Sequence, residues 1–315
     1  MRHALFKSLD IPLTKSRFKN LNVEKFKLPD DVLERCMTPA LILYKDSLVR
    51  NVRKILKHCD NDPKRWRPHL KTTKSGVLYK MLIQEGGITQ FKVATTREAE
   101  LIATSIRDTG AEGGDVLVAY PLQGPNMKRL EAIANEFSET KFSVLVESEC
   151  GARSVPSSLD CFVDINVGQN RTGMSLEKAE KGAVVDVVDT ILKTGRRFRG
   201  LHLYDGHSQN FHDGEDRNAQ VRSVGEAGTR LMNLLSQAGH NVEEIITAGT
   251  PSLLSALKFI NSLDGNDDHD HDVRRAVSPG TVVLHDLTSE VSNEELDLEP
   301  ACAVLSRVSV VFGGL

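Results

Sequence analysis

The chain has 315 residues, a length that allows one large or two ordinary domains with a full-sized core. With 40% hydrophobic and 26% charged residues, its composition fits a soluble globular enzyme. A net charge of −3 gives no reason to expect a nucleic acid or an anionic membrane as partner. No apolar run approaches the ~20 residues of a membrane span. The first twelve residues lack the apolar region of a secretory signal, although their basic character leaves a mitochondrial presequence as an alternative.

The cysteines indicate a reducing compartment. They are odd in number, widely spaced and without a C-x-x-C pair, which is typical of free cytoplasmic thiols and not of a disulfide framework or a zinc site. The five positions are Cys36, Cys59, Cys150, Cys161 and Cys302.

From about residue 65 onward, short β-rich runs alternate with helical patterns. The expected strands are Arg65–Leu70, Gln90–Thr95, Asp115–Tyr120, Lys141–Glu147, Cys161–Val167, Gly200–Asp205, Glu244–Ala248 and a weaker Val273–Ser278. The expected helices are Gly76–Glu85, Thr96–Arg107, Asn126–Phe137, Leu176–Thr194, Ala219–Ala238 and Pro251–Asn261. Such alternation predicts parallel βαβ units, and eight of them predict a (β/α)8 TIM-type barrel. A doubly wound sheet is the alternative, but no G-x-G-x-x-G follows the first strand.

Three segments lie outside this barrel. Ala40–Tyr44 is an expected strand that has no place in the ring of eight. Thr281–Leu284 and Ala303–Val311 are β-branched runs without an intervening helix, so we expect them to pair antiparallel in a second, all-β domain.

The Asp- and His-rich residues 264–272 could chelate a divalent ion weakly, but they fit a solvated insertion loop better.

Lys71 is the first candidate functional residue. It follows the first expected strand, and the C-terminal ends of barrel strands carry the chemistry of these folds. His69 lies two residues earlier, on the same face of the strand. A lysine amine at this place can condense with a carbonyl group once burial lowers its pKa. An ordinary solvated loop lysine is the alternative when this segment is taken alone.

Polar residues follow the later strands as well. After the fifth strand, a turn bracketed by glycines places Arg171 at the barrel mouth, unless Arg171 is a salt-bridged turn residue. An arginine facing a pyridine nitrogen would leave that nitrogen unprotonated, because arginine keeps its proton. After the sixth strand come Tyr204, which could stack on a cofactor or belong to the core, and His207 and Gln209, which could be simple loop residues.

The segment Ala248–Ser252 follows the seventh strand and has the features of an anion site. Gly249 allows close approach of the backbone, Thr250 offers a hydroxyl, and Pro251 fits the first turn of a helix. An ordinary helix cap at Thr250 is the alternative. Barrels often bind phosphate after strands seven and eight. Together with the lysine across the mouth, this segment favours a phosphate-bearing aldehyde cofactor.

Several motifs resemble the D-threonine aldolase / D-serine dehydratase family of fold-type III pyridoxal phosphate enzymes, which have an alanine-racemase-like barrel. The similarity runs in order from about residue 38 to the end of the chain. The matching segments are 38–41, 67–75, 93–100, 115–121, 171–173, 204–209, 248–252 and 278–286. The resemblance implies that Lys71 is the covalent attachment point of pyridoxal 5'-phosphate, and it excludes Lys74 from that role. It also implies a D-amino acid substrate and a homodimer.

The resemblance implies a lyase that acts on D-β-hydroxy amino acids. Thr73 stands where many relatives, particularly the dehydratases, have histidine, and this favours a D-threonine aldolase-like retro-aldol reaction that gives glycine and an aldehyde. The alternatives are a D-serine dehydratase-like ammonia-lyase, an amino-acid racemase, and a non-catalytic protein that carries the cofactor. We expect Lys71 and His69 to be catalytic and Lys71, Arg171, Tyr204, Gln209, Gly249 and Thr250 to bind the cofactor.

The domain organisation follows from the same resemblance. We expect an extension at 1–37, a strand at 38–50 contributed to the β-domain, a barrel at 51–279, and the start of a truncated β-domain at 280–315. The family's divalent metal, Mn²⁺ or Zn²⁺, binds in that second domain, and the resemblance carries no metal ligand over to this chain. A metal-stimulated, fully active chain would make His285 and Asp286 the first suspects. We therefore expect weak cofactor binding, aggregation through exposed edges at Val304, Leu305, Val308, Val310 and Phe312, and little lyase activity.

Overall fold

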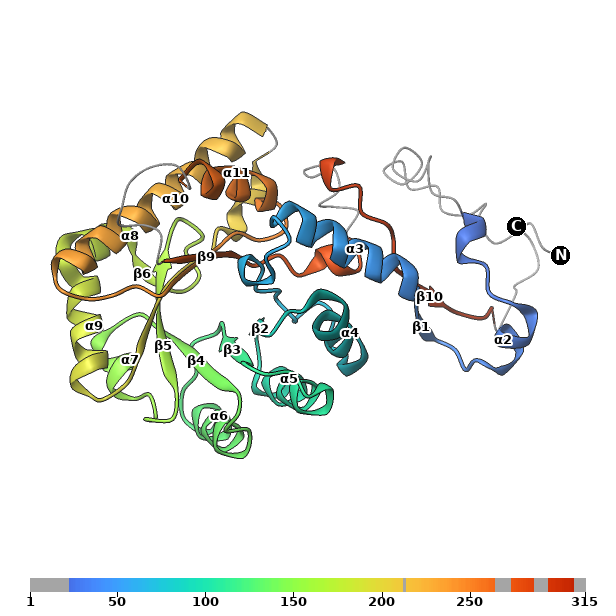
Figure 1. Ribbon diagram of the computed structural model, residues 1–315, viewed down its shortest axis with the longest axis horizontal. Coiled ribbons are helices and arrows are strands. Elements are labelled where there is room, and N and C mark those ends of the chain that lie inside the picture. The colour runs from blue at the N-terminus through green and yellow to red at the C-terminus, as the bar shows by residue number, and fades with distance from the viewer. Residues whose placement is uncertain (1–22, 212–213, 264–272, 286–293, 309–315) are drawn as a thin grey trace.

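A curled sheet of parallel strands forms the centre of the computed structural model, which describes residues 23–211, 214–263, 273–285 and 294–308 (Figure 1). Its strands lie in the order β2-β3-β4-β5-β7-β8-β9, and the short β6 pairs with the end of β5. Every neighbouring pair is parallel, as the alternation of strands and helices predicts. The strands are β2 Gln90–Val93, β3 Asp115–Val118, β4 Lys141–Val146, β5 Asp160–Asn166, β6 Met174–Ser175, β7 Phe198–Leu203, β8 Glu244–Thr247 and β9 Arg274–Val277.

The predicted first strand is present as an irregular segment between the two edges of this sheet. Isolated parallel bridges join Trp66 to Val277 of β9 and His69 to Lys92 of β2. Pro68 has no N–H to donate, which prevents a regular ladder here. The segment therefore connects β9 to β2, and all eight positions of the predicted barrel are occupied.

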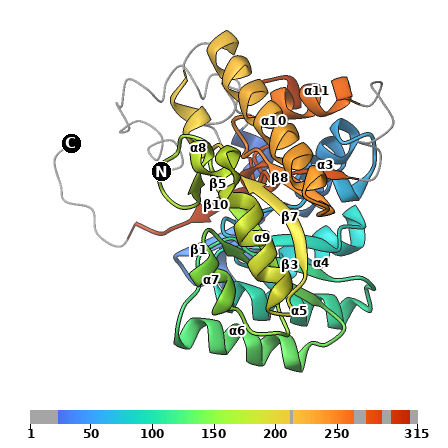
Figure 2. The ribbon, with the colours of Figure 1, turned by 90° about the vertical axis from the view of Figure 1, so that its left-hand side faces the viewer.

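Helices cover the outside of the sheet (Figure 2). The six predicted helical segments are confirmed, although the fourth is divided by a π-helical turn at 179–183. The sequence interpretation missed α3, whose buried face includes Leu48, Val52 and Ile55. The helices are α2 Asp30–Arg35, α3 Lys45–His58, α4 Gly76–Gly86, α5 Thr96–Thr109, α6 Pro125–Glu136, α7 Glu149–Arg153, α8 Leu176–Lys178, α9 Val184–Lys193, α10 Gly214–Gln237 and α11 Leu253–Leu263. Short 3-10 turns lie at Val23–Phe26, Pro63–Arg65, Gly206–Asn210, Thr281–Val283 and Glu294–Leu296.

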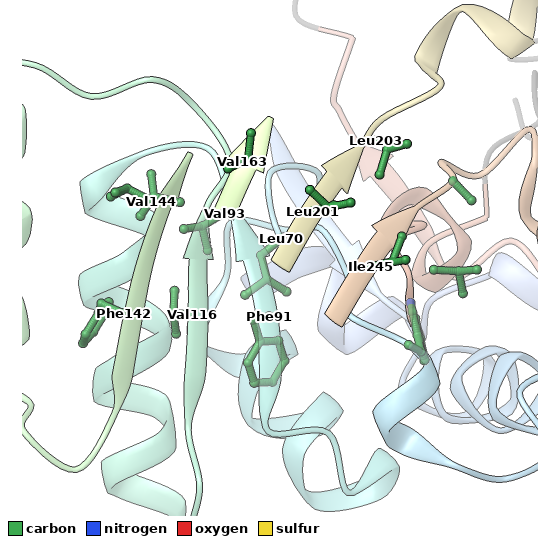
Figure 3. Close-up of a cluster of buried hydrophobic side chains, with 14 of the residues drawn as sticks. Leu70, Phe91, Val93, Val116, Phe142, Val144, Val163, Leu201, Leu203 and Ile245 are labelled. Carbon is green, nitrogen blue, oxygen red and sulfur yellow. The ribbon is translucent and has the colours of Figure 1, made fainter. Parts of the chain in front are cut away.

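The main hydrophobic core lies between the sheet and these helices (Figure 3). Val116, Val144 and Val163 come from three adjacent strands, and all three are fully buried. Parallel sheets covered by helices on their outer face have such apolar strands. Because these side chains face outward, the residues between them along each strand face into the barrel.

Ala40–Leu43 forms β1, which lies outside the larger sheet as predicted and pairs antiparallel with β10 (Cys302–Leu305). The prediction that Thr281–Leu284 pairs with this C-terminal strand was wrong. Those residues form a 3-10 turn in which Val282 and Val283 are buried, and the carbonyl of Val283 accepts a hydrogen bond from Asn51. Packing against α3 therefore replaces strand pairing in this segment.

One face of the two-stranded ribbon is exposed. Leu41 pairs with Val304, and these two side chains are 59% and 71% exposed. Val308 is also exposed, whereas Val310 and Phe312 lie outside the described residues. Among the described helices, none combines the length and the apolar character that a membrane crossing requires.

Candidate active site

The interior of the barrel begins with a layer of ion pairs near the N-terminal ends of the strands. The buried guanidinium of Arg67 lies between two carboxylates, 3.0 Å from Asp115 and 2.7 Å from Glu244. Arg199 contacts Asp115 at 2.7 Å and Asp160 at 3.2 Å. Burial alone would raise the pKa of Asp115, but the two guanidinium groups lower it. This ionic layer is paired within itself.

An apolar layer lies next along the strands. It consists of four buried side chains, and the guanidinium groups of Arg67 and Arg199 approach the ring of Phe162 to 5.9 and 5.6 Å. The apolar layer separates the ionic layer from the barrel mouth. Its members are Leu117, Leu145, Phe162 and Ile246.

A second polar layer follows above the apolar one. Two positions beyond Phe162 on β5 is Asp164, and its Oδ1 lies 2.7 Å from Nδ1 of His202 on β7. Nε2 of the same ring lies 3.4 Å from Nζ of Lys92 on β2. His69 completes this layer, and all four side chains are buried.

The aromatic ring of Tyr204 forms the centre of the barrel mouth. Nζ of Lys71 lies 5.9 Å from the ring centroid, and Nζ of Lys92 lies 4.9 Å from it. Cζ of Arg171 lies 5.3 Å from the same centroid. His202 stacks beneath the ring with an interplanar angle of 15°. Three cationic groups thus surround one aromatic side chain.

The electrostatics of the mouth make the amine of Lys71 easier to deprotonate. Although Lys71 is exposed as a residue, desolvation of its amine and the positive charge of Arg171 lower its pKa. Burial and the charges of Lys92 and Lys71 lower the pKa of His69 well below its ordinary value. The backbone N–H of Lys71 donates to Nδ1 of His69 at 3.4 Å, so the neutral imidazole has its proton on Nε2.

The loop that carries Arg171 is fixed by its glycines. Gly173 has a φ of +97°, and a Cβ at this position would lie 2.8 Å from the backbone nitrogen of Asn166. The N–H of Gly173 donates to Glu147 at 2.6 Å. These contacts tie the arginine to the ends of β4 and β5.

The turn after β8 differs in part from the prediction. The N–H of Gly249 points into the protein, where it donates to Oδ1 of Asp205 at 3.2 Å and to Oγ of Ser252 at 3.1 Å. It is therefore engaged and does not face a ligand. The following helix begins at Leu253 instead of Pro251. Thr250 is buried, and its Oγ1 accepts a hydrogen bond from Thr281 at 2.7 Å, which joins the turns after β8 and β9.

Gly249 packs closely against the aromatic ring. A Cβ at this glycine would lie 3.3 Å from both Cε2 and Oη of Tyr204. A side chain here would press against the ring, so the glycine allows the turn after β8 to lie close to Tyr204. The structure thus places Lys71, Arg171, Tyr204, Gly249 and Thr250 around one mouth. Gln209 belongs to the 3-10 turn 206–210, and its side chain lies outside what the structure describes.

The sequence interpretation missed four buried polar residues of this site: Lys92, Asp164, His202 and Asp205. A usable signal was present, since each of the first three is a polar residue between two apolar residues of a strand. In a strand that is buried on both faces, such a residue must face the interior of the barrel.

The structure also bears on the metal. In the described ranges, no group of three or more His, Cys, Asp and Glu side chains is arranged to hold a metal ion. His285 is described, whereas Asp286 and the Asp- and His-rich residues 264–272 are not.

Fold and site together define an α/β barrel protein with an amine-centred site at the C-terminal ends of its strands. The chain matches the family described as "Alanine racemase, N-terminal domain" over residues 44–264, and it belongs to that family. The predicted barrel is therefore confirmed.

Relatives with known activities cover the same region. The chain is 27% identical over 224 residues to 3-hydroxy-D-aspartate aldolase of Paracoccus denitrificans (strain Pd 1222), which covers 68% of this chain and 55% of the relative. It is 22% identical over 236 residues to D-threo-3-hydroxyaspartate dehydratase of Delftia sp. (strain HT23), which covers 73% of this chain and 59% of the relative. The chain thus spans a little over half the length of these relatives.

A solved structure agrees in fold. D-threonine aldolase from Filomicrobium marinum superposes with a TM-score of 0.67 at 24% identity, covering 87% of this chain and 71% of that structure. At this identity the likeness establishes the shared fold alone.

Proposed function

We propose that the chain is a pyridoxal-phosphate-dependent lyase that acts on D-β-hydroxy amino acids. The main support for this proposal is the cluster of Lys71, Lys92 and Arg171 within 6 Å of the Tyr204 ring centroid. Cations so close together repel one another, and an anionic aromatic ligand at the ring would relieve that repulsion. Pyridoxal phosphate is such a ligand.

The residues of the mouth fit this cofactor. Lys71 supplies an amine with a lowered pKa for the aldehyde, and Tyr204 supplies an aromatic surface beside the glycine of the turn after β8. The joined turns at Thr250 and Thr281 would hold the phosphate. When bound, pyridoxal phosphate supplies an electron-accepting ring that stabilises negative charge at a substrate carbon.

The chain's own residues would set the direction of the chemistry. A guanidinium group donates hydrogen bonds and accepts none, so a ring nitrogen that faces Arg171 stays unprotonated. That arrangement limits how much negative charge the ring accepts from the substrate carbon. His69 is held neutral with its proton on Nε2, where it can donate to a substrate oxygen.

An aldolase reaction, with glycine and an aldehyde as products, is the first candidate. The supporting observation is the similarity to an aldolase for 3-hydroxy-D-aspartate at 27% identity. An ammonia-lyase reaction is the second candidate, since the dehydratase for the D-threo form is 22% identical. Thr73 does less to distinguish an aldolase from a dehydratase than its sequence position indicated. Its hydroxyl donates a hydrogen bond to the carbonyl of Leu70 at 3.1 Å.

Borohydride reduction tests the cofactor. The protein incubated with pyridoxal phosphate should show a visible absorption band, and reduction should fix the cofactor to the peptide that contains Lys71. Lys71→Ala should lose the adduct, whereas Lys74→Ala should retain it. An adduct at Lys74 or Lys80 would show that the barrel register is wrong.

Product analysis tests the reaction. With D-3-hydroxyaspartate, D-threonine and D-serine, with and without Mn²⁺ or Zn²⁺, an aldolase releases glycine and a dehydratase releases ammonia and a 2-oxo acid. We expect glycine from D-threonine or D-3-hydroxyaspartate. Pyruvate and ammonia from D-serine, with no glycine from the other two substrates, would reverse our order of the candidates.

A further inference from the structure

The amine of Lys92 lies inside the barrel, below the mouth. Only 1% of this residue is exposed, and its Nζ lies 3.4 Å from Nε2 of His202. Within the described ranges, no carboxylate forms an ion pair with it. A buried ammonium group without a carboxylate partner is costly, so this amine is poised to lose its proton.

Asp164 and His202 hold this amine in place. Burial and the charge of Lys92 lower the pKa of His202, so its ring is neutral. Nδ1–H of the ring donates to Oδ1 of Asp164 at 2.7 Å, which leaves the lone pair on Nε2 directed at Lys92. Lys92 donates to that lone pair and still has capacity for a proton on the side of the mouth.

The amines of Lys92 and Lys71 are electrostatically coupled. Burial, followed by the charge of Lys71, lowers the pKa of Lys92 to about 7, although Asp164 and Asp205 oppose this shift. The pKa of Lys71 is itself lowered. The titratable and charged groups that face Lys92 from the surrounding elements are Arg67, His69, Lys71, Asp164, Arg171, His202, Tyr204 and Asp205.

We propose that Lys92, positioned by the Asp164–His202 pair, is the proton-accepting partner of Lys71. Lys92 takes the proton that Lys71 gives up when Lys71 forms a bond with an aldehyde. This inference rests on the proposed function in one respect, namely that Lys71 reacts with an aldehyde.

The step balances in atoms and charge. It begins with the ammonium form of Lys71, the neutral amine of Lys92 and an aldehyde. A C=N bond forms at Nζ of Lys71, and the aldehyde oxygen leaves as water with two of the three ammonium hydrogens. The third proton passes to Nζ of Lys92, so the positive charge moves from one lysine to the other.

A titration of the cofactor-free chain tests the coupling. Protein that contains lysine labelled with ¹³C at Cε is freed of carbonyl compounds with hydroxylamine, and the Cε shifts are followed by NMR from pH 5 to 11. Lys92 should titrate near neutral pH. Lys71→Met should raise this midpoint by about one pH unit, because it removes a neighbouring positive charge. Asp164→Asn should lower it.

The matched control is Lys80→Met, which removes an exposed lysine paired with Asp108 and should leave the midpoint of Lys92 unchanged. A midpoint for Lys92 above pH 10, or one that Lys71→Met does not move, would overturn the proposal.

A second experiment separates proton acceptance from a fixed charge. Capture of pyridoxal phosphate at Lys71, measured as borohydride-fixed adduct at early times, should be roughly tenfold slower at pH 7 in Lys92→Met. It should recover at pH 9.5, where hydroxide removes the proton. Lys92→Arg should be as slow as Lys92→Met, because a guanidinium accepts no proton.

The outcomes distinguish the two proposals. Lys92→Arg with the rate of the unmodified chain would show that Lys92 acts as a fixed charge, and this inference would be wrong. An absence of any adduct at Lys71 in the unmodified chain would instead reject the proposed function, while the NMR titration still decides whether the two amines are coupled.

Discussion

The two polar layers inside the barrel use similar residue types but pair them in opposite ways. In the lower layer, each arginine lies between carboxylates, and Asp115 is shared by Arg67 and Arg199. In the upper layer, cations gather around a tyrosine, and two carboxylates are directed elsewhere. The upper cations are Lys71, Lys92 and Arg171, while Asp164 bonds to His202 and Asp205 to Gly249 and Ser252.

The difference indicates what each layer does. A paired network satisfies its own charges and lowers the pKa of Asp115, the carboxylate that both arginines share. A cluster of cations lowers the pKa of its amines and is relieved by a bound anion. The apolar layer that contains Phe162 lies between the two polar layers. It separates the carboxylates of the lower layer from the amines of the upper layer.

The largest effect is expected in the lower layer. Arg67→Met removes a buried guanidinium and leaves Asp115 and Glu244 without that partner, so the free energy of unfolding should fall by about 3–5 kcal/mol. Urea denaturation at pH 7 measures this. Arg53→Met, which removes an exposed pair with Glu85, is the control and should leave the midpoint nearly unchanged. Equal stability of the two variants would mean that the ionic layer does not stabilise the fold.

The upper layer should show the opposite sign. The folded-state pKa of Lys92 is about 7, below its ordinary value, so the unfolded chain binds one more proton between pH 7 and about 10.5. This contribution to stability therefore rises with pH through that window, and its cost is fully present below pH 7. Lys92→Met should be more stable than the unmodified chain by roughly 2 kcal/mol at pH 6.

That advantage should shrink as the pH rises toward 10. Urea titrations at pH 6, 8 and 10 follow it, with Lys80→Met as the surface control. If Lys92→Met were less stable than the unmodified chain at pH 6, Lys92 would stabilise the fold as the lower ionic layer does. The contrast between the two layers would then be wrong.

Removal of the aromatic platform should affect binding more than folding. Tyr204→Leu should weaken retention of pyridoxal phosphate by about tenfold, because the ring that faces the three cations is lost. Tyr204→Phe keeps the ring and should bind nearly as well. Absorbance titration with the cofactor compares the two variants. If both lose the same affinity, the hydroxyl of Tyr204 and not its ring is what matters.

The smallest expected effect concerns Arg171. Its charge lowers the pKa of Lys71, so Arg171→Met should raise that pKa and reduce the neutral fraction of the amine near pH 8. Acetic anhydride should then label Lys71 about threefold more slowly relative to Lys74 in the same protein. Arg153→Met, which removes an exposed pair with Glu149, is the control. Faster labelling in Arg171→Met would show that Arg171 shields the amine from the reagent instead of tuning it.

Local sequence patterns were sufficient to predict most strands and helices of the barrel. Alternation of apolar runs and amphipathic segments predicted the parallel strands, because each βαβ unit buries its strand beneath its own helix. The failures occurred where a contact is distant in sequence. The run at Thr281 is β-branched, yet burial against α3 makes it a 3-10 turn. Its predicted partner at 303 pairs instead with Ala40–Leu43.

The sequence by itself determined that Lys71 follows the first strand segment and that glycines shape the turns beside it, since strand ends and turn chemistry are local properties. Tertiary structure alone decided which ionisable groups are neutral. Asp164 and His202 are 38 positions apart, and Lys92 and His202 are 110 apart. A pKa depends on burial and on charges across the barrel, and those neighbours exist only once the strands have closed around one interior.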